Sequence, residues 1–416
     1  MILKPYLLKL DYKGTPQNHL DNLYKIYRNN ENKFTDIFNE GIRKEMYYEW
    51  ILLSTCHRFE VYLLAENLKF KDYLLNEFNK LTNLNLDKFF KILKEREVLE
   101  HITKVATGVE SKIIGEKDIF IQMKESYEIK NCYCKKNSIL RFIFDKAKMI
   151  ALKYRNSTNI ESGFTSYGDI ALKILKNKYS NLENKKILIF GAGNLGKYFI
   201  KNLSSFNPFV TSRNIYFYKK DYEKYNINPI EFYQIEKNPK MLSNFDIIIT
   251  CLAGDFFSSV FKKCIKYLKK DVIVLDLGVP PNIANLIIDK KIRKYTLSQF
   301  SPLIQKDNIL KEKIKEKIKE KIKEEIKKTI IEGIEERKEK NFMGLSDVND
   351  KKIKAYVLRS SLKYNGKISK ESILGKLFNE GIDKKDITKF AAKIDEEIEW
   401  LKNLSIEEQK SLFEEL

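Results

Sequence analysis

The sequence predicts a multidomain α/β protein whose last quarter is helical. Its 416 residues are too many for one ordinary core and fit two or three domains. Near residue 190 a short apolar strand leads through a glycine-rich turn into a helical run, which is typical of a parallel α/β unit. Isoleucines spaced four apart, within residues 303–340, then indicate one long helix.

The composition supports buried cores and an anionic partner. Hydrophobic residues make up 43% of the chain and aromatic residues 12%. Lys and Arg number 77 against 57 Asp and Glu, and the resulting charge of +20 attracts polyanions such as nucleic acids. The chain is also generally rich in Lys, Asn and Ile, so the charge taken alone favours a habit of composition over a nucleic-acid partner.

Cysteine and histidine usage argues against a metal site. The five cysteines form no C-x-x-C pair and the three histidines offer no zinc-ligand spacing, so we expect a reducing compartment and no metal. The first residues, MILKPYLLKLDYKG, lack the uninterrupted apolar core of a signal peptide, and no run of 18 apolar residues occurs. We therefore expect a cytoplasmic protein that does not use a membrane.

The first elements surround a cysteine. Residues 2–12 are expected to form a strand and residues 18–39 a helix. Two apolar runs of strand composition between Glu49 and Glu66 then flank residues 54–58, which we expect to be an exposed connection. Cys56 lies there, followed by His57 and Arg58, and positive charge of this kind makes a cysteine a better nucleophile. A free cysteine used as a small hydrophobe is the alternative.

Residues 69–150 are predicted to be mainly helical, with apolar positions three and four apart at Val98, Ile102, Val105 and Val109. His101 falls inside this pattern, where it is either a helix-packing imidazole or a proton carrier. Glu116 and Gln122 are either solvated helix residues or site residues.

A dinucleotide site is predicted in the middle of the chain. The strand Lys185–Phe190 runs directly into Gly191, Ala192, Gly193, Asn194, Leu195 and Gly196, and a helix follows through Leu203. Such glycines let the backbone approach a pyrophosphate at the helix N-terminus, although a plain glycine turn has the same composition. The next strand ends at Ser212 and Arg213, where a hydroxyl and a guanidinium replace the carboxylate that selects NAD, so NADP is favoured. Further strands are expected at residues 246–250 and 272–275.

The last part of the chain is predicted to be helical. Isoleucines at 314, 318, 322, 326, 330 and 334 advance about 40° per step, so the apolar row winds around the helix. A spine that contacts different parts of the protein in turn fits this winding, and an exposed charged rod is the alternative. Residues 341–416 read as helices broken near Gly344, Gly366 and Gly381.

Two motifs resemble the glutamyl-tRNA reductase family. Residues 53–62, LSTCHRFEVY, resemble its L-S-T-C-N-R-x-E-x-Y, with His57 in place of the usual Asn. Residues 101–111, HITKVATGVES, followed by Gly115-Glu116 and Gln122, resemble H-L-F-R-V-A-x-G-L-D-S-x-x-x-G-E-x-Q. Lys117 and Asp118 replace the usual Pro-Gln, and Pro281 replaces an Arg. The resemblance covers roughly residues 1–330.

The resemblance implies an architecture and a reaction. It implies an N-terminal α/β catalytic domain that binds glutamyl-tRNA (1–155), a Rossmann-type NADP-binding domain (156–300), and a spinal helix leading to an all-α dimerisation domain (301–416). The reaction would be the NADPH-dependent reduction of glutamyl-tRNA(Glu) to glutamate-1-semialdehyde through a cysteine thioester. This is the first step of tetrapyrrole synthesis from glutamate. The implied partners are a second copy of the chain and glutamate-1-semialdehyde aminomutase.

The resemblance also assigns roles. Cys56 would be the nucleophile, His101 would protonate the leaving oxygen, and Arg58 would pair with the glutamyl side-chain carboxylate. A protonated His57 would lower the pKa of Cys56. The remaining residues expected to contact the substrate are Thr55, Ser111, Glu116, Lys117, Asp118 and Gln122. Two other functions stay open, namely a different NADP-dependent dehydrogenase with a small carbonyl substrate and a non-catalytic relative that binds tRNA.

Overall fold

The computed structural model describes residues 3–130, 132–135, 138–179, 181–212, 215, 223–252, 258–279, 281–283, 286–287 and 292–342, with short pieces at 357–358, 360–361, 394–405 and 408–409. The chain divides into two compact units, Met1–Ile326 and Lys327–Leu416. In the second unit residues 394–402 are helical, whereas the predicted breaks near Gly344, Gly366 and Gly381 lie outside the described residues. Dimerisation through this unit stays a prediction.

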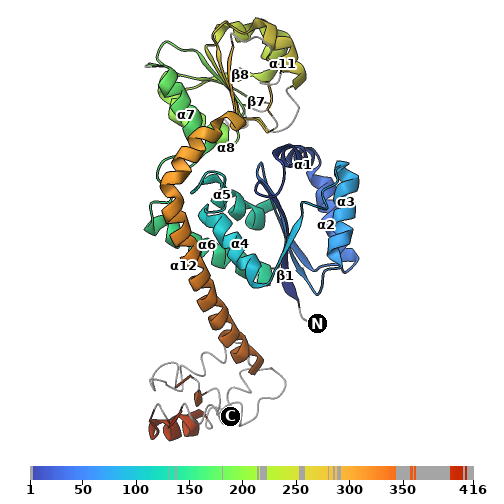
Figure 1. Cartoon of the computed structure of the whole chain (residues 1–416), viewed down its shortest axis with the longest axis vertical. Helices are drawn as coiled ribbons and strands as arrows, with labels where there is room; N and C mark the ends of the chain where they lie inside the picture. Colours follow the sequence, from blue (N-terminus) through green and yellow to red (C-terminus); the bar gives the residue numbers. More distant parts are fainter. Residues whose placement is uncertain are drawn as a thin grey trace. The chain divides into compact units, whose positions relative to one another are not determined.

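The first sheet of the first unit is antiparallel and is covered on both faces (Figure 1). Its strands lie in the order β4-β1-β3-β2-β5. Their bounds are β1 Lys4–Asp11, β2 Glu49–Thr55, β3 Arg58–Ala65, β4 Lys91–Lys94 and β5 Cys132–Tyr133. The short edge strands β4 and β5 escaped the sequence prediction.

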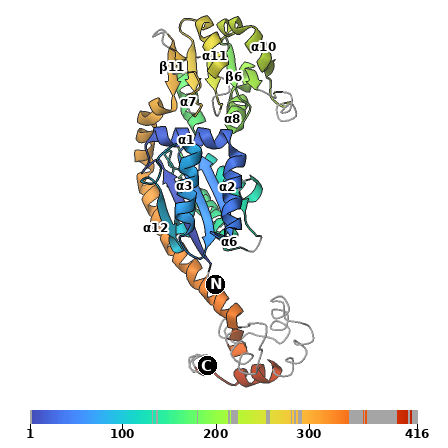
Figure 2. The same ribbon diagram turned by 90° about the vertical axis from the view of Figure 1, so that its right-hand side faces the viewer.

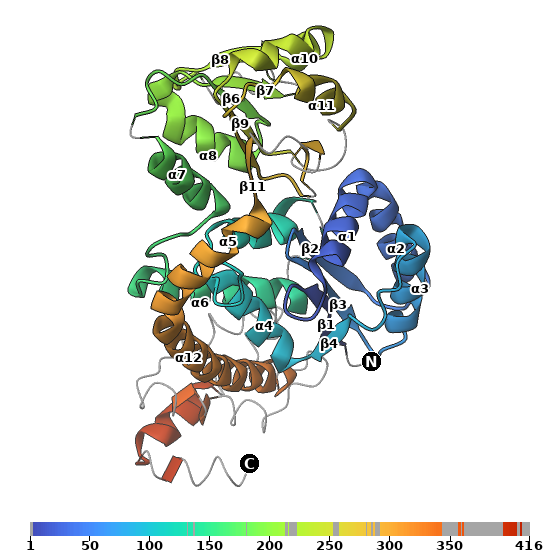
Figure 3. The same ribbon diagram turned by 45° about the horizontal axis from the view of Figure 1, so that its top comes forward.

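Helices cover the two faces of this sheet (Figure 3). One layer contains α1 (Gln17–Asn29), α2 (Glu31–Arg43) and α3 (Phe70–Thr82), and its phenylalanines pack on alternate residues of the strands. The other layer contains α4 (Arg96–Thr107), α5 (Asp118–Glu125), the π-helix η1 (Ser126–Lys130) and α6 (Ile139–Ser157). Both faces are therefore apolar, which explains the nearly continuous apolar strands.

Two helix predictions are wrong in detail. The expected helix 18–39 is two helices, because Asn30 leaves the helical conformation at φ −136° and its side-chain amide donates to the Ile26 carbonyl at 2.9 Å. The helix around His101 ends at Thr107, before Val109, because Gly108 adopts φ 80° and caps it.

The second sheet has six parallel strands in the order β11-β10-β9-β6-β7-β8. This is the strand order of a Rossmann fold, and it reverses between β6 and β9, where such folds bind dinucleotides. The strands are β6 Ile187–Phe190, β7 Phe209–Ser212, β8 Asn228–Glu231, β9 Ile247–Thr250, β10 Ile273–Asp276 and β11 Arg293–Thr296. The strands expected from the sequence are confirmed, and β8 and β11 are additional.

Helices on both sides of the second sheet complete its two cores (Figure 2). They are α7 Tyr167–Lys178, α8 Asn194–Leu203, α10 Phe232–Lys237 and α11 Ser258–Cys264. Short 3-10 helices lie at η2 Ser204–Phe206, η4 Pro239–Asn244, η5 Ile265–Tyr267 and η7 Leu297–Phe300. The predicted multidomain α/β class with a Rossmann-type sheet is confirmed.

The long helix α12 (Ser301–Phe342) contacts first the domain of the second sheet and then the domain of the first sheet. Ile304 packs into the core of the second sheet, and Ile318, Ile322 and Ile326 are fully buried further along. Glu325 then bonds Lys153 of α6 at 2.7 Å. The expected spine is confirmed for the described side chains, and the exposed rod is wrong. None of the helices in the described ranges is long and apolar enough to cross a membrane.

Lys311 fixes α12 against two chain segments near the first sheet. Its ammonium group is 1% exposed and donates to the carbonyls of Ile114, at 2.9 Å, and Phe164, at 2.6 Å. Asp307 pairs with it at 2.8 Å. The helix is thereby attached to the loop before Glu116 and to the segment that leads into α7.

Candidate active site

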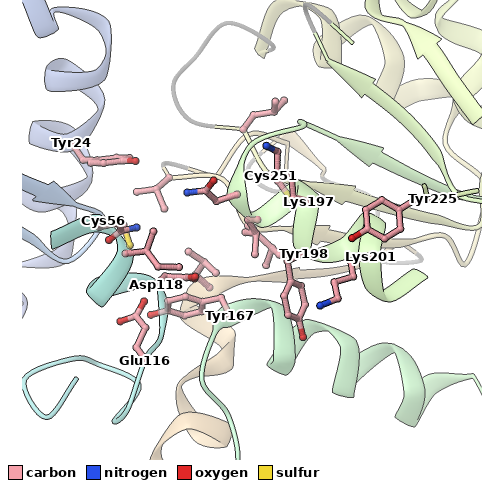
Figure 4. A pocket seen from close by; sticks show the side chains of 18 of the residues that line it. Tyr24, Cys56, Glu116, Asp118, Tyr167, Lys197, Tyr198, Lys201, Tyr225 and Cys251 are labelled. Atoms are coloured by element: carbon pink, nitrogen blue, oxygen red, sulfur yellow. The ribbon is translucent and has the colours of Figure 1, made fainter. Parts of the chain in front are cut away.

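A cavity of 760 Å³ is shared by the two sheet domains of the first unit (Figure 4). Cys56, Glu116 and Asp118 lie on one side of it, and Lys197, Tyr198 and Lys201 of α8 lie on the other. Of the residues predicted from the sequence, the cavity wall contains Cys56, Glu116, Asp118, Gln122, Asn194 and Leu195. Residues from both predicted sites therefore meet in one cavity.

Cys56 sits in a two-residue turn. Thr55 of β2 pairs with Arg58 of β3, so only Cys56 and His57 connect the strands. The predicted exposed connection is wrong, because His57 is 7% and Arg58 2% exposed. Other segments cover the turn: Tyr167 of α7 meets His57 Nε2 at 2.5 Å, and Arg58 donates to the Glu110 carbonyl at 2.9 Å.

Cys56 itself remains accessible from the cavity, although its thiol is held in the protonated form. Burial raises the pKa of Cys56 to about 12, and the nearby carboxylates of Glu116 and Asp21 add to the rise. The positive charge of Lys112 opposes this rise. The neighbouring positive charge does not produce the thiolate that the sequence suggested, so a base must take the proton before the sulfur can attack.

His57 is neutral in this environment. Burial lowers the pKa of His57 to about 3, and the positive charges of Lys112 and Arg58 lower it further. The expectation that a protonated His57 lowers the Cys56 pKa is therefore wrong. The ring is oriented by Tyr167, and its buried Nδ1 has no hydrogen-bond partner among the described residues.

Glu116 is the group on the cavity wall that titrates near neutrality. Burial raises the pKa of Glu116 to about 7, and the carboxylate of Asp118 contributes. Its loop is fixed by Gly115, whose φ is 79° and whose added Cβ would lie 2.0 Å from the Ile160 carbonyl oxygen. Arg155 also holds the loop by donating to the Glu116 carbonyl at 2.6 Å. A carboxyl group with this pKa can accept and return a proton at physiological pH.

A buried ionic cluster lies away from the cavity wall. Glu60 is 0% exposed; it accepts from Arg58 at 3.0 Å, from His101 at 2.8 Å and from Tyr62 at 2.7 Å. Burial alone would raise the pKa of Glu60, but His101 and Arg58 hold it well below its usual range. Arg58 and His101 are thus fixed directly behind the turn. Glu60, a charged residue between the apolar Phe59 and Val61, is the feature of the sequence that could have indicated this cluster.

The other predicted substrate residues are spread around the site. Thr55 accepts a hydrogen bond from the His57 backbone at 3.2 Å, and Ser111 is 4% exposed, with no hydrogen-bond partner for its hydroxyl within the described ranges. Lys117 pairs with Glu161 at 3.2 Å and does not line the cavity. Sequence reasoning missed further lining residues, which are Tyr24, Tyr167, Lys197, Tyr198, Lys201, Lys224, Tyr225 and Cys251. Only the Lys197 and Lys201 pair, four apart after the glycine turn, gave a usable signal.

The glycine turn fits a dinucleotide. Gly191 has φ 105°, and Gly196 has no room for a side chain because a Cβ would lie 2.0 Å from the Gly191 carbonyl oxygen. A Cβ at Gly193 would meet no atom of the described residues within 4 Å, so these residues leave space for a ligand at the N-terminus of α8. In dinucleotide-binding turns the first glycine makes the tight turn, the second lets the backbone approach the pyrophosphate, and the third allows the helix to pack closely on the strand. Ala192, between them, is 3% exposed.

The end of β7 carries the residues expected to select NADP. Ser212 is 8% exposed, and its hydroxyl has no hydrogen-bond partner in the part of the chain that the structure describes. Arg213 lies outside the described residues. Among the described residues no group of three His, Cys, Asp or Glu side chains is placed to hold a metal ion.

The sheet order, the glycine turn and the cysteine in the shared cavity define a dinucleotide-binding protein with a candidate thiol nucleophile. Residues 9–158 match the family model of the glutamyl-tRNA(Glu) reductase N-terminal domain, and residues 173–301 match the shikimate / quinate 5-dehydrogenase model. The chain belongs to the glutamyl-tRNA reductase family.

Individual relatives agree with this assignment. The glutamyl-tRNA reductase of Wigglesworthia glossinidia brevipalpis is 31% identical over 303 residues, which are 66% of this chain and 68% of that protein. The one of Clostridium novyi is 26% identical over 322 residues, 74% of each chain. The one of Picrophilus torridus is 29% identical over 297 residues, 70% of this chain and 65% of that protein. The structure of glutamyl-tRNA reductase from Methanopyrus kandleri aligns with 99% of this chain and 97% of its own, at 17% identity and a TM-score of 0.43.

Proposed function

We propose that the protein reduces glutamyl-tRNA(Glu) to glutamate-1-semialdehyde with NADPH, through a thioester on Cys56. The observation that carries this proposal is the shared cavity, whose wall contains Cys56 together with Asn194 and Leu195 of the dinucleotide turn. A thiol that can hold an acyl group and a turn that can hold a hydride donor are the two parts that such a reduction needs. Family membership supplies the substrate.

The first step would be attack of the Cys56 sulfur on the ester carbonyl of glutamyl-tRNA. The S–C bond forms, the bond to the tRNA 3′ oxygen breaks, and the thiol proton must leave. We assign this proton to Glu116, whose pKa of about 7 suits a general base at neutral pH. Protonation of Glu116 also removes one of the charges that raise the Cys56 pKa, so the transfer favours the thiolate.

Arg58 and His101 would act from the buried cluster. Arg58 donates one bond to Glu60 and one to the Glu110 carbonyl, and we assign its remaining N–H groups to the side-chain carboxylate of the glutamyl group. His101 would protonate the leaving tRNA oxygen, with Glu60 holding its ring in place. Thr55, His57, Ser111, Asp118 and Gln122 would complete the substrate contacts, with Lys117 at the margin.

The cofactor would lie across the glycine turn. Residues 191–196 would hold the pyrophosphate, and Ser212 with Arg213 would hold the 2′-phosphate that distinguishes NADP from NAD. When bound, NADPH supplies the hydride that turns the thioester into the aldehyde. The lysines on the cavity wall, at 197, 201 and 224, and the net charge of +20 suit a site that takes two phosphate-bearing molecules.

The same proposal extends to the domain organisation, the location and the partners of the protein. We propose a catalytic domain at 1–155, an NADP-binding domain at 156–300 and a dimerising part at 301–416. We also propose a cytoplasmic homodimer that supplies glutamate-1-semialdehyde to its aminomutase.

The test is product formation from glutamyl-tRNA under four conditions, with NADPH, with NADH, with free glutamate in place of the charged tRNA, and with Cys264→Ser as a matched thiol control. We expect semialdehyde only from charged tRNA, several-fold more with NADPH than with NADH, and unchanged in the control. A non-catalytic relative would bind charged tRNA and give no product. A different dehydrogenase would reduce small carbonyl compounds without tRNA, and either result would end the proposal.

A further inference from the structure

A second cysteine site lies at the edge of the first sheet, apart from the cavity. Cys132 and Cys134 are half-buried and lie on either side of Tyr133, which is 52% exposed. Cys132 is in β5, where it pairs with Ile51 of β2. Residues two apart in an extended segment point to the same face, so the two thiols lie side by side. Neither is part of a disulfide.

The surroundings bring an acceptor and a cation to this site. The Cys132 thiol donates to the Tyr127 carbonyl at 3.3 Å. Arg141 of α6 donates to the same carbonyl at 3.1 Å and stacks over the Tyr127 ring at 5.2 Å, so its positive charge lies beside the two thiols. A thiol, a second thiol and a guanidinium group therefore converge on one accessible spot.

The charges around the pair separate the roles of the two thiols. The neighbouring Cys132 thiol and the guanidinium of Arg141 lower the pKa of Cys134 below its usual value, against burial and the carboxylate of Glu49. The neighbouring Cys134 sulfur and burial raise the pKa of Cys132. Cys134 is thus the more nucleophilic thiol, and Cys132 is its protonated neighbour.

The other cysteines are held protonated. Burial raises the pKa of Cys56 to about 12, that of Cys264 to about 11, and that of Cys251 as well. Cys134 is therefore the cysteine with the largest share of thiolate at neutral pH.

We propose that Cys132 and Cys134 form a peroxide-sensitive dithiol, in which Cys134 is oxidised first and Cys132 closes the disulfide. The site consumes the oxidant at the sheet edge while Cys56 stays reduced. The proposal stands apart from the proposed reductase activity, because it rests on the residues of β5 and α6.

The chemistry balances with a hydroperoxide as the only co-reactant. The Cys134 thiolate attacks one peroxide oxygen, the O–O bond breaks, and the leaving hydroxide takes a proton, so Cys134 becomes a sulfenic acid. Cys132 then loses its proton and attacks the Cys134 sulfur, the S–O bond breaks, and water leaves. With hydrogen peroxide, two thiols give up two electrons and two protons, and two water molecules form.

Closure of the disulfide needs a small movement at the end of β5. Two residues of a strand span about 6.6 Å between Cα atoms, near the upper limit for a disulfide. Cys134 lies just beyond the last residue of β5, and the next backbone N–H, that of Lys135, makes a long 3.3 Å bond to Glu49. This weak attachment is what the closure would break.

The test follows the oxidation state of each cysteine by mass spectrometry, starting from the reduced full-length protein. Trypsin cleavage after Lys130 and Lys135 gives one peptide with both cysteines, so a disulfide lowers its mass by two hydrogens. After limiting hydrogen peroxide at pH 7 and blocking with N-ethylmaleimide, we expect this peptide to be oxidised while the Cys56 peptide remains fully blocked. Without peroxide, iodoacetamide should modify Cys134 at least tenfold faster than Cys56, with a rate that is half-maximal at a pH below the usual pKa of a thiol.

Three variants and one control variant sharpen the test. Cys132→Ser should leave a sulfenic acid on Cys134 that dimedone captures, and Cys134→Ser should abolish oxidation of the peptide. Arg141→Gln should move the alkylation profile to higher pH, whereas Cys264→Ser should change nothing. The proposal is overturned if Cys56 reacts before Cys134, or if the 131–135 peptide stays reduced at peroxide levels that oxidise any other cysteine or inactivate the protein.

Discussion

Replacement of Glu116 by glutamine tests whether this carboxyl group titrates near neutrality. Burial raises its pKa from the ordinary value of 4.5 to about 7, with Asp118 contributing. At 1.36 kcal/mol per pKa unit, the shift corresponds to about 3 kcal/mol in favour of the protonated form in the folded protein. The stability that this preference contributes is fully present below about pH 4.5, and it is lost as the pH rises through about 7.

Glutamine resembles the protonated carboxyl group and carries no charge at any pH. The free energy of unfolding of Glu116→Gln should therefore match the wild type near pH 4.5 and exceed it by up to about 3 kcal/mol near pH 8.5. Urea unfolding at the two pH values measures this difference. Glu125→Gln, an exposed change on the adjacent helix, serves as the control for loss of one negative charge. An equal effect of Glu116→Gln at both pH values would show that Glu116 does not titrate near neutrality in the folded protein.

The same substitution tests the proposed base. Transfer of the Cys56 proton to Glu116 predicts that the rate of thioester formation rises with pH through about 7 in the wild type. Without the carboxylate the rate should fall by about 10²- to 10⁴-fold, the usual contribution of a general base. Rapid quenching with labelled glutamyl-tRNA measures it, and an unchanged rate in Glu116→Gln would remove this role.

Three further predictions follow from the packing. Lys311→Met leaves two buried carbonyls without a donor and Asp307 without its ion-pair partner and should lower the unfolding free energy by about 3 kcal/mol, whereas Lys317→Met, an exposed position of the same helix, should change it by less than about 0.5 kcal/mol in urea titrations. Gly193→Ala should keep the unfolding midpoint but weaken NADPH binding about tenfold or more by fluorescence titration, and Gly196→Ala should lower the midpoint itself. His57→Asn should keep semialdehyde formation within about tenfold of the wild type, since the imidazole is neutral and its family counterpart is an amide; a loss as large as removal of the thiol would show a separate chemical role.

Local sequence signals predicted the parts of the fold that depend on neighbouring residues. The strand at residue 187, the turn from Gly191 to Gly196 and the long helix were all readable, because their spacing and glycines act over a few residues. The strands β8 (NPIE) and β11 (RKYT) were missed because most of their residues are polar, unlike those of the other four-residue strands, and Pro229 lies inside the first. Such strands form through pairing with a neighbour that is distant in sequence.

The environment of Cys56 could not be predicted from the sequence, because it also depends on residues that are distant in sequence. His57 and Arg58 look like an exposed cationic pair, but Tyr167, about 110 residues later, buries the first, and the Glu110 carbonyl binds the second. Their charges are then determined by contacts across the fold. The cationic wall of the cavity has a similar origin, because Lys197 and Lys224 come from elements that only the sheet brings together.

The central claim is that Cys56 accepts the glutamyl group. Mass spectrometry of the protein after mixing with glutamyl-tRNA in the absence of NADPH tests this most directly. We expect a glutamyl adduct on the peptide that carries Cys56, sensitive to hydroxylamine as a thioester is, and absent from Cys56→Ser. An adduct on another residue, or semialdehyde production by Cys56→Ser at the wild-type rate, would contradict it.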